Sequence, residues 1–558
     1  MAFPFDTAGA TIPVRQSKIP TYRDRFLSDV IYGAIYPVMM KFTLPGSFYK
    51  LNIKSFLRYQ PMVAPPLNGA TARFRLCWVP LRQIEPNSEL IITGSKDGHF
   101  DSDTVIPKFE SVFDISQGQA EVKKHSFSEI LGLPVGLNTN NAIDSVKGAF
   151  SPALYWYKGY NKIWWDVYRD ENLFTNFETF DEFWDEQKLW CNDSDLNKGL
   201  QFSYLPKNYF TSALPWQMKG IVPTIALSGN LSFANTELFR GQEGFSDLNP
   251  IGGDSRNPIQ PNLQQPFSVS AEASGMSISF EQQVANLNQK ARMQLEKGTT
   301  TGFSFNADDF RTMMAQTRVF EQLARTGSRY VEFLRSMFGT APRDDTLQRA
   351  VYLGGCKVPI ITTEVIQTAE DGTNPVGTMR GHGITSSSDT LSTPMFKEYG
   401  LLYLLMDILP DISFTQGVNR QFSYKSRFDF PIPAFQHLSE QEIRRGELYV
   451  DYPRQGQSTV TPNDNTFGFT EMYNELRTGR TFIGGSFKDT LRYWHQGIIF
   501  DSVPNLNNAF IDSSSYLEQF NRIFNVVESD TYPILADVNI FVDSVLPLDK
   551  RSTPGTRR

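Results

Sequence analysis

Four carboxylates crowd a short segment near position 180 and could carry out acid–base chemistry. They are Asp181, Glu182, Asp185 and Glu186. Paired carboxyl groups beside a sugar-stacking ring such as Trp184 would suit glycoside hydrolysis. The same spacing is typical of the solvated face of an amphipathic helix whose opposite face carries Phe177, Phe180 and Phe183. We favour the helical interpretation, because a solvated face is the commoner origin of such a cluster.

The other residues that could do chemistry are scattered along the chain. The histidines are His99, His125, His382, His437 and His495. None is paired at a metal-binding spacing, and we expect His437 and His495 to be packed or exposed surface side chains. The cysteines, Cys77, Cys191 and Cys356, are too widely spaced to define a disulfide framework, which favours a reducing compartment. We therefore predict no catalytic residue, no metal and no cofactor.

Positive charge gathers at the two ends of an acidic chain. The net charge of −7 argues against a dedicated high-affinity nucleic-acid binder, although it permits a local basic face. The cations that we predict to contact a nucleic-acid backbone are Arg15, Lys18, Lys550, Arg551, Arg557 and Arg558. Flexible cations of this kind exchange for condensed counterions on a phosphate backbone. The alternative is that the tail, residues 550–558, only keeps the protein soluble.

The elements that position these residues are mainly strands. Aromatics at 13% of the chain, with 44 Phe and 22 Tyr, favour strands, and 33 Pro with 39 Gly indicate many turns. Apolar and polar residues alternate, as in half-buried strands, over residues 49–54, 72–78, 421–432 and 534–546. The first and last of these lie near opposite ends of the chain. This predicts a barrel or sandwich closed by its own termini, with large loops between strands.

Helical signals are few and lie between the predicted strands. Ser279 and Gln282 form a capping-box pattern ahead of an apolar stripe over 280–295. A second helical region opens near Asp308 and ends before Gly339, and a weaker one spans 172–190. The first residues lack the pattern of a secretory signal, so we expect synthesis in the cytoplasm. The most apolar run, Tyr399 to Pro410, is too short to span a bilayer.

Several aromatic- and glycine-rich blocks occur in an order that resembles a known family. They are Leu44–Phe48 with Ser55–Arg58, Tyr160–Leu173, Tyr209–Gly220, Gly327–Tyr330 with Leu353–Gly355, Gln416–Arg420 with Ser426–Phe430, and Phe467–Phe469 with Tyr473–Arg477 and Leu491–His495. Their content and order resemble the major capsid protein of the Microviridae, the small tailless single-stranded DNA phages, and most of all its gokushovirus-like members. The matches run from about residue 40 to 548. Glu171 stands where the family has Gln, and residues 1–40 and 221–301 match less well.

The resemblance implies an all-β fold, an eight-stranded antiparallel jelly roll of capsid type with large loop insertions that contain a few helices. The whole chain, 1–558, would be one such domain, with 221–301 as a surface-exposed insertion or protrusion. It implies a structural, non-enzymatic protein of the virion, assembled in the host bacterial cytoplasm. Copies of the chain would assemble into a T=1 icosahedral shell around circular single-stranded DNA. Its further partners would be a small basic DNA-binding protein, a pilot protein, a scaffolding protein and a host cell-surface receptor.

Contacts between subunits are expected from the block at 209–220. Aromatic anchors dominate interface energies, and we predict such contacts at Tyr209, Phe210, Leu214 and Trp216. Arg420 and Arg427 are expected to pair with carboxylates such as Asp411 or Asp429, or to stack on aromatic rings. The alternatives from other function classes are a jelly-roll lectin that binds carbohydrate and the glycoside hydrolase considered above.

Overall fold

The computed structural model describes most of the chain outside its longest loops. The described residues are 16–93, 122, 124–135, 153–192, 200–220, 231–232, 268–272, 275–279, 299–300, 307–327, 329–366, 379–437, 439–453, 461–479, 481–524 and 531–550. Contacts divide the chain into two compact units. The first comprises Met1–Ile221 and Arg318–Arg558, and the second comprises Val222–Thr317.

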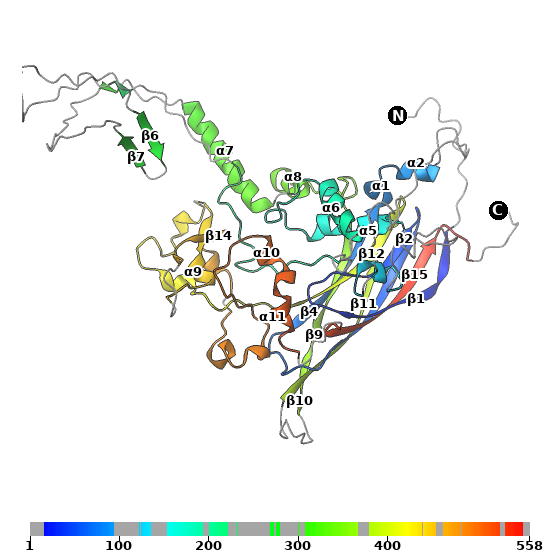
Figure 1. Cartoon of the computed structure of the whole chain (residues 1–558). Coiled ribbons are helices and arrows are strands. Elements are labelled where there is room, and N and C mark those ends of the chain that lie inside the picture. The colour runs from blue at the N-terminus through cyan, green and yellow to red at the C-terminus, as the bar shows by residue number, and fades with distance from the viewer. Residues whose placement is uncertain are drawn as a thin grey trace, which may run out of the picture. The chain divides into compact units, whose positions relative to one another are not determined.

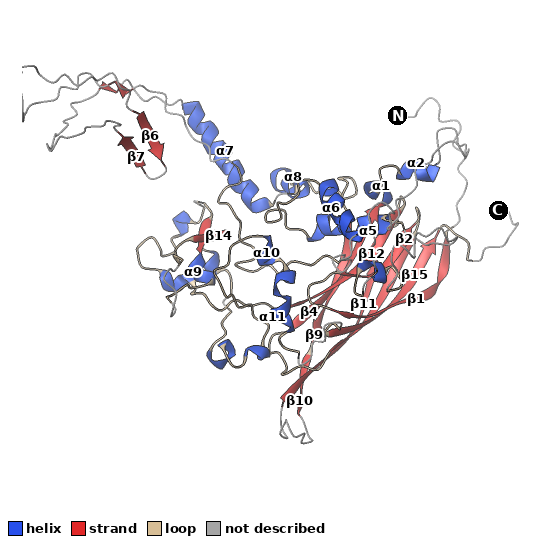
Figure 2. Ribbon diagram, viewed as in Figure 1, coloured by secondary structure: helices blue, strands red, loops and turns tan. Residues whose placement is uncertain are grey.

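Two antiparallel sheets build the first unit (Figure 1, Figure 2). The five-stranded sheet runs in the order β1 (Ser17–Val30), β15 (Ile534–Leu546), β3 (Phe48–Tyr59), β11 (Met379–Ser392) and β10 (Thr362–Ile366). The four-stranded sheet runs in the order β2 (Tyr36–Thr43), β12 (Gly400–Pro410), β4 (Ala70–Pro80) and β9 (Val351–Ile360). The prediction of a mainly β protein built on antiparallel sheets is confirmed.

The last strand of the chain lies between the first and the third. β15 pairs with β1 on one side and with β3 on the other, so that Ile540 is opposite both Asp24 and Ile53. Alternate residues of β15, from Ile534 to Val542, are buried and those between them are at least partly exposed. This alternation is the pattern read from the sequence, and the predicted closure by segments near both termini is confirmed.

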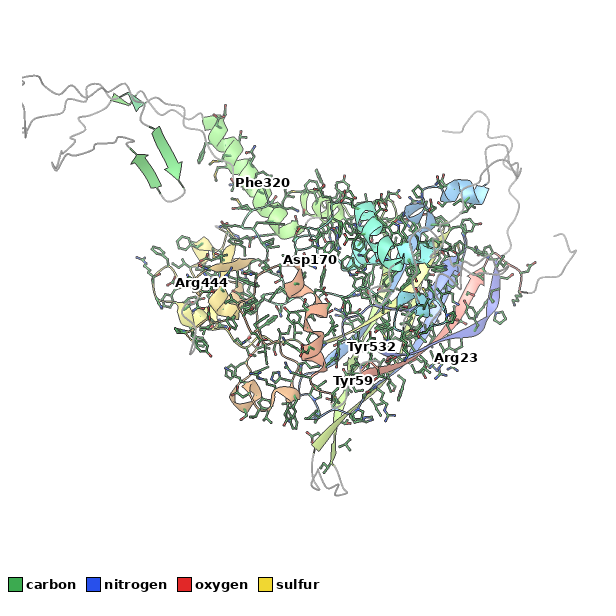
Figure 3. The ribbon with its side chains drawn as sticks, viewed as in Figure 1. Arg23, Tyr59, Asp170, Phe320, Arg444 and Tyr532 are labelled. Carbon is green, nitrogen blue, oxygen red and sulfur yellow. The ribbon has the colours of Figure 1, made fainter. Side chains whose placement is uncertain are left out.

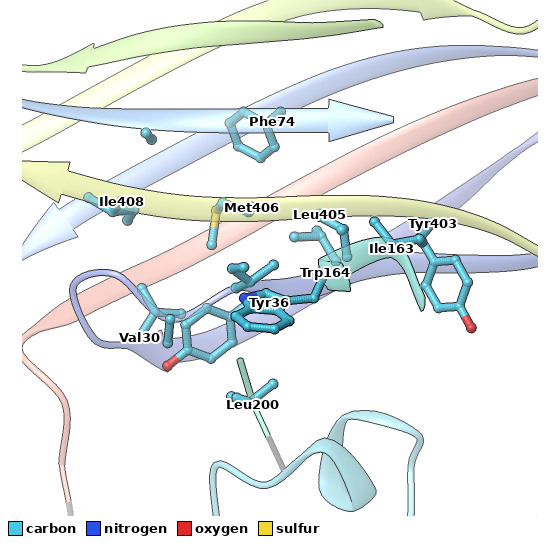
Figure 4. Close-up of a cluster of buried hydrophobic side chains, with 14 of the residues drawn as sticks. Val30, Tyr36, Phe74, Ile163, Trp164, Leu200, Tyr403, Leu405, Met406 and Ile408 are labelled. Atoms are coloured by element: carbon cyan, nitrogen blue, oxygen red, sulfur yellow. The ribbon is translucent and has the colours of Figure 1, made fainter. Parts of the chain in front are cut away.

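The core lies between the sheets and continues beneath the helices. Figure 4 shows part of it, with Tyr36, Phe74 and Met406 of the four-stranded sheet and Trp164 among the buried side chains. Its largest fully buried side chains are mainly Tyr and Phe. Burial of such side chains contributes about 1.5–3 kcal/mol each, which makes this core the main source of stability.

The two sheets differ in how their outer faces are covered. Every residue of β12 is buried, because α5 (Tyr155–Ile163) packs on the face that points away from the other sheet. The approach is close at Gly159, where an added Cβ would lie 2.7 Å from the Tyr403 hydroxyl. That hydroxyl donates a hydrogen bond to the carbonyl of Trp156 (2.7 Å). In contrast, β3 alternates strictly, and Lys50, Lys54 and Arg58 are exposed.

Further elements of the first unit are short. They are α1 (Leu81–Ile84), α2 (Ser88–Thr93), α3 (Phe127–Ile130), the π-helical turn η2 (Trp164–Tyr168), α6 (Phe180–Asn192), α8 (Tyr330–Phe338), β13 (Gln441–Arg444), α9 (Arg445–Leu448), β14 (Thr466–Thr470), α10 (Asn508–Ile511) and α11 (Leu517–Asn521). Among the described residues, no helix is both long enough and apolar enough to cross a membrane.

The second unit is described only in part. β5 (Leu231–Ser232) pairs with β8 (Thr299–Thr300), and β6 (Ser268–Glu272) pairs with β7 (Gly275–Ser279). The helix α7 (Ala307–Thr326) begins in this unit and ends in the first. The predicted outward position of residues 221–301 stays a prediction.

The helical predictions have different outcomes. The region from Asp308 to Gly339 is helical as predicted, but it is divided into α7 and α8 at Gly327 (φ 86°). Gly339 ends α8 in the left-handed conformation (φ 68°), which glycine adopts without strain. The helix predicted over 172–190 forms only from Phe180 onward. The stripe over 280–295 lies outside the described residues.

The strand predicted over residues 421–432 is wrong. The segment opens with a 3₁₀ turn, η4 (Arg420–Ser423), and continues as turns. The Asp429 carboxylate accepts hydrogen bonds from the backbone N–H groups of Lys425 (2.9 Å) and Ser426 (2.6 Å), which closes a local turn. Alternation indicates a strand only where one face is buried, whereas Phe428 is 70% exposed.

Candidate functional site

The acidic cluster forms the solvent face of α6. Its four carboxylate residues are exposed, while Phe183 and Trp184 are buried on the other side. The Phe183 ring stacks on Trp164 at 5.4 Å between centroids. Since Trp184 is buried in the core, it is not placed to stack on a sugar. The helical interpretation is confirmed.

The histidines in the described part of the chain do not converge on a reaction centre. His495 is buried, with its Nε2–H donating to the Phe487 carbonyl (2.8 Å), while His437 is exposed. His125 pairs with Asp29 (2.8 Å) and stacks on Tyr532. His99 lies outside the described residues. In the described part of the chain, no group of His, Cys, Asp and Glu could hold a metal ion.

Three blocks that are distant in sequence meet around a small cavity of about 100 Å³. The Tyr209 hydroxyl donates to Glu447 Oε2 (2.9 Å), and the Arg420 guanidinium pairs with Glu447 Oε1 (3.2 Å). Glu475 also lines the cavity, and its Oε1 accepts a hydrogen bond from the Tyr424 hydroxyl (2.6 Å). The polar network around Glu447 thus joins the block at 209–220 to that at 416–420, and the Tyr424–Glu475 pair ties the following segment to the block at 473–477.

Burial sets the electrostatics of this network. It raises the pKa of the Glu447 carboxyl, although Arg420 and the backbone N–H of Arg444 favour its charged form. Burial, followed by the nearby Glu447 charge, also raises the pKa of Tyr209, which therefore stays a hydrogen-bond donor. Such a network fixes loops to one another and offers no free nucleophile or base. Arg420 pairs with a carboxylate as expected, but the partner is Glu447.

A second set of hydrogen bonds connects the block at 160–173 to the segments that follow α7 and α8. Arg329 Nε donates to Glu171 (3.0 Å), and its Nη2 donates to the Arg169 carbonyl (2.7 Å). The Asp166 carboxylate accepts a hydrogen bond from the backbone N–H of Ala350 (2.8 Å). Glu171, which departs from the family pattern, therefore has a structural partner in this chain.

The predicted subunit contacts are half-buried within the chain itself. Phe210 packs edge-on against Phe414 (5.7 Å), and the backbone of Leu214 bonds with that of Phe469 in both directions (2.8 Å each). Trp216 lies under the ammonium of Lys219 (5.9 Å). Together with Tyr209, these residues first serve intrachain packing. Their role between subunits stays a prediction.

Two of the predicted DNA contacts fall in the described part of the chain. Lys18 is exposed on β1, and Lys550 is exposed after the end of β15. Arg15, Arg551, Arg557 and Arg558 lie outside the described residues. Arg427, expected to be structural, is exposed and lies 6.0 Å from the centre of the Phe428 ring.

Two surfaces were not identified from the sequence. One is the row of exposed cations on β3, although the alternation over 49–54 already separated Lys50 and Lys54 from the apolar side chains. The other is the set of exposed aromatics at Phe428 and Phe430, which the predicted strand had placed on a buried face. In both cases the missing information was which face the rest of the chain covers.

The chain is similar to known proteins over nearly all of its length. Residues 26–556 match the model of the family described as capsid protein (F protein). The chain is 24% identical to capsid protein VP1 of Chlamydia phage 1, over 94% of this chain and 93% of the relative. It is 26% identical to capsid protein VP1 of Bdellovibrio phage phiMH2K (94% and 92%) and 24% identical to that of Spiroplasma virus 4 (94% and 93%).

Proposed function

The chain belongs to the capsid protein (F protein) family, and on this basis we propose that it assembles into a T=1 icosahedral shell around a circular single-stranded DNA genome. As a capsid protein it is a structural component of the virion. The observation that carries the proposal is the extent of the match, because it spans both sheets and the loops between them.

We propose that the two sheets form an eight-stranded jelly roll. Numbered in chain order, β1, β2, β3, β4, β9, β11, β12 and β15 become strands one to eight. The sheets then read 1-8-3-6, extended by β10, and 2-7-4-5. This interleaving supports two Greek keys wrapped into a double-sheet roll. It also agrees with the position of the last strand between the first and the third.

Exposed aromatic side chains support self-association. Phe428 is 70% exposed and Phe430 55% exposed, and Phe482 on another loop is 68% exposed. Large apolar side chains of this kind gain free energy when a partner covers them. A second copy of the chain is the partner that a capsid supplies. The less exposed Tyr209, Phe210, Leu214 and Trp216 remain proposed contacts beside them.

The other partners in this proposal are the packaged DNA, a small basic DNA-binding protein, a pilot protein, a scaffolding protein and a receptor on the host surface. An acidic chain of net charge −7 encloses a polyanion more readily when a basic protein offsets part of the charge. This argument supports the basic partner in particular.

Size-exclusion chromatography followed by negative-stain microscopy tests the proposal. We expect the purified protein, co-produced with its phage partners, to form particles of uniform diameter. The double variant Phe428→Ser/Phe430→Ser should yield fewer particles with unchanged circular dichroism, whereas Lys425→Ser, which changes an exposed polar side chain of the same segment, serves as the control and should assemble normally. Small species that bind a carbohydrate column, with no particles, would support the lectin instead.

A further inference from the structure

One face of the five-stranded sheet has no covering element among the described residues. On β3, the side chains at alternate positions from Lys50 to Arg58 are exposed or half-exposed, and the intervening ones are buried in the core. β1 and β15 continue the same outer face on one side of β3, and β11 continues it on the other. Figure 3 labels Arg23 on β1 at this face. On the four-stranded sheet, helix α5 packs instead on β12 and β4.

The charges on this outer face are predominantly positive. Its cations, assigned by strand register and exposure, are Lys18, Arg23, Arg25, Lys50, Lys54 and Arg58. Its acids in the described strands are Asp29, Asp537 and Asp543, and Asp29 is paired with His125 (2.8 Å). Asp537 is held by Arg25 through two hydrogen bonds of 2.9 Å, and Asp543 accepts one from Thr21. Arg23 donates only to a neutral amide, that of Asn539 (2.8 Å).

Aromatic rings and small polar groups lie between the cations. Phe56 is 43% exposed and stands between Lys54 and Arg58 along β3. Phe541, on β15, lies under the Lys54 ammonium at 5.0 Å. Opposite Phe56 and Lys54, β11 presents the hydroxyls of Ser386 and Ser388. The face therefore alternates positive charge, π surface and hydrogen-bonding groups.

We propose that this outer face binds the packaged single-stranded DNA, with phosphates on Lys50, Lys54 and Arg58 and a base stacked on Phe56. The proposal rests on the proposed function, because a shell must enclose DNA for the face to meet it. Unpaired bases expose the π surface that a ring such as Phe56 can stack on, whereas paired bases hide it. Unpaired lysines are depleted in protein–protein interfaces, which argues against a subunit contact here.

Two of the cations that were predicted from the sequence to contact DNA, Lys18 and Lys550, lie at one end of this sheet. Lys18 lies on this face at the start of β1, opposite Val545 near the end of β15. Lys550 follows the same end of β15. Both predicted contacts thus extend a charged surface whose centre is β3, and the face as a whole would point to the interior of the shell.

Binding of labelled oligodeoxythymidylate to the full-length subunit, followed by fluorescence anisotropy at several salt concentrations, measures these contacts. The test variant is Lys50→Gln/Lys54→Gln/Arg58→Gln. The matched control is Lys357→Gln/Lys397→Gln/Lys425→Gln, which removes three exposed cations from outside the face. Loss of three phosphate contacts should lower the salt slope by about 2 and weaken binding about 100-fold at roughly 0.1 M salt. The control should behave like the wild type.

Two further measurements separate the contributions. Phe56→Ala should weaken binding about fivefold or more with an unchanged salt slope, because it removes stacking and no charge. Particles of the triple cation variant should assemble with wild-type diameter and show a lower ratio of nucleic-acid to protein absorbance. The control particles should keep the wild-type ratio.

Two results would overturn the proposal. In the first, the triple cation variant matches its control in salt slope and in the nucleic-acid content of particles. In the second, it no longer assembles yet keeps wild-type affinity for the oligonucleotide, which would make the face a protein contact. Failure of the wild-type chain to form particles would instead count against the shell, and the binding measurements would still decide the role of the face.

Discussion

Asp407 is a buried charge in the middle of the four-stranded sheet, and its partners come from the neighbouring strand. Its carboxylate is fully buried, accepts a hydrogen bond from Arg73 Nε (2.8 Å) and lies 3.5 Å from Arg75 Nη1. Arg75 also lies over the Tyr168 ring at 4.4 Å, which links β4 to the π-helical turn. Two guanidinium groups around one carboxylate are stable only while that carboxylate is charged.

Asp407→Asn should therefore destabilise the subunit by about 3–5 kcal/mol, because it leaves two largely buried cations without a counter-charge. Urea denaturation of the dissociated subunit measures this. Glu471→Gln is the comparison, since the Glu471–Arg477 pair is more than half exposed and should contribute less than about 1 kcal/mol. Equal effects of the two substitutions would contradict the assignment.

His495 makes the stability of the subunit depend on pH. Burial lowers its pKa, and its Nδ1 accepts hydrogen bonds from the Gly497 N–H and from Arg522 (3.1 Å each), which requires the neutral ring. Below the ordinary histidine pKa of about 6.5, the unfolded chain binds a proton that the folded chain does not. The stability that His495 contributes is thus present above that pH and is lost as the pH falls through the folded-state value.

We expect the urea midpoint of the wild type to fall between pH 7.5 and pH 5.5, and His495→Gln to reduce this pH dependence. The exposed His437 provides the control, because His437→Gln should keep the wild-type dependence. A pH profile of His495→Gln identical to that of the wild type would show that other groups cause the change.

At the scale of elements, α5 is the cover of the four-stranded sheet. Its contact with β12 depends on the absence of a side chain at Gly159, where a Cβ would also lie 3.0 Å from Leu401 Cδ1. The hydrogen bond from Tyr403 to Trp156 fixes the helix at this distance from the strand. The close approach therefore explains a glycine in the interior of a helix, a position that otherwise disfavours it.

Gly159→Leu should destabilise the subunit by about 1–3 kcal/mol beyond any gain in helix propensity, because it forces α5 away from β12. The measurement is again urea denaturation. Lys158→Leu introduces the same side chain at the adjacent, half-exposed position and should have a smaller effect. If both substitutions lower the free energy of unfolding equally, the close contact between α5 and β12 is not what excludes a larger side chain at residue 159.

The strands that could be predicted from the sequence are those with one covered face. β3 and β15 alternate because the core lies on one side of them, the first half of β4 alternates likewise, and all three were found. β12 was seen only as an apolar run, because burial on both faces removes the period-two signal. The strand predicted over 421–432 failed for the opposite reason, since its aromatics are exposed.

The contacts of the candidate functional site could likewise be predicted only in part from the sequence. The resembling blocks could be read in order, but the pairs Tyr209–Glu447 and Arg329–Glu171 join residues with no local relation in sequence. Glu447 lies outside the blocks, so that nothing marked it in advance. Similarly, the alternation on β3 identified a polar face, whereas the absence of a covering element among the described residues is a property of the folded chain.

At the scale of the whole molecule, both sheets belong to the first unit. The two ends of this unit that flank the second are near each other, because the Lys219 N–H donates to the Phe320 carbonyl (3.4 Å). The Phe320 ring also lies beside Gly220 (Figure 3). The chain therefore leaves and re-enters the first unit at one place, as expected for a tolerated insertion.

Replacing residues 222–317 by a short Gly/Ser linker should leave a soluble first unit whose cooperative unfolding has a midpoint close to that of the full chain. The reason is that neither sheet contains a residue of the second unit. Circular dichroism during urea denaturation checks this. An aggregated product, or a gradual transition without cooperativity, would show that the second unit is needed for the fold of the first.

The position of β15 between β1 and β3 has a consequence for biosynthesis. Paired side chains such as Arg23 and Asn539 are 516 positions apart, so β1 and β3 emerge from the ribosome long before the strand that joins them. At ordinary rates of translation the interval is roughly 25–100 s. During that time both strands have unpaired edges, which are open to pairing with other chains. A nascent or truncated chain cannot complete this sheet, so only chains translated to the end can enter a growing shell.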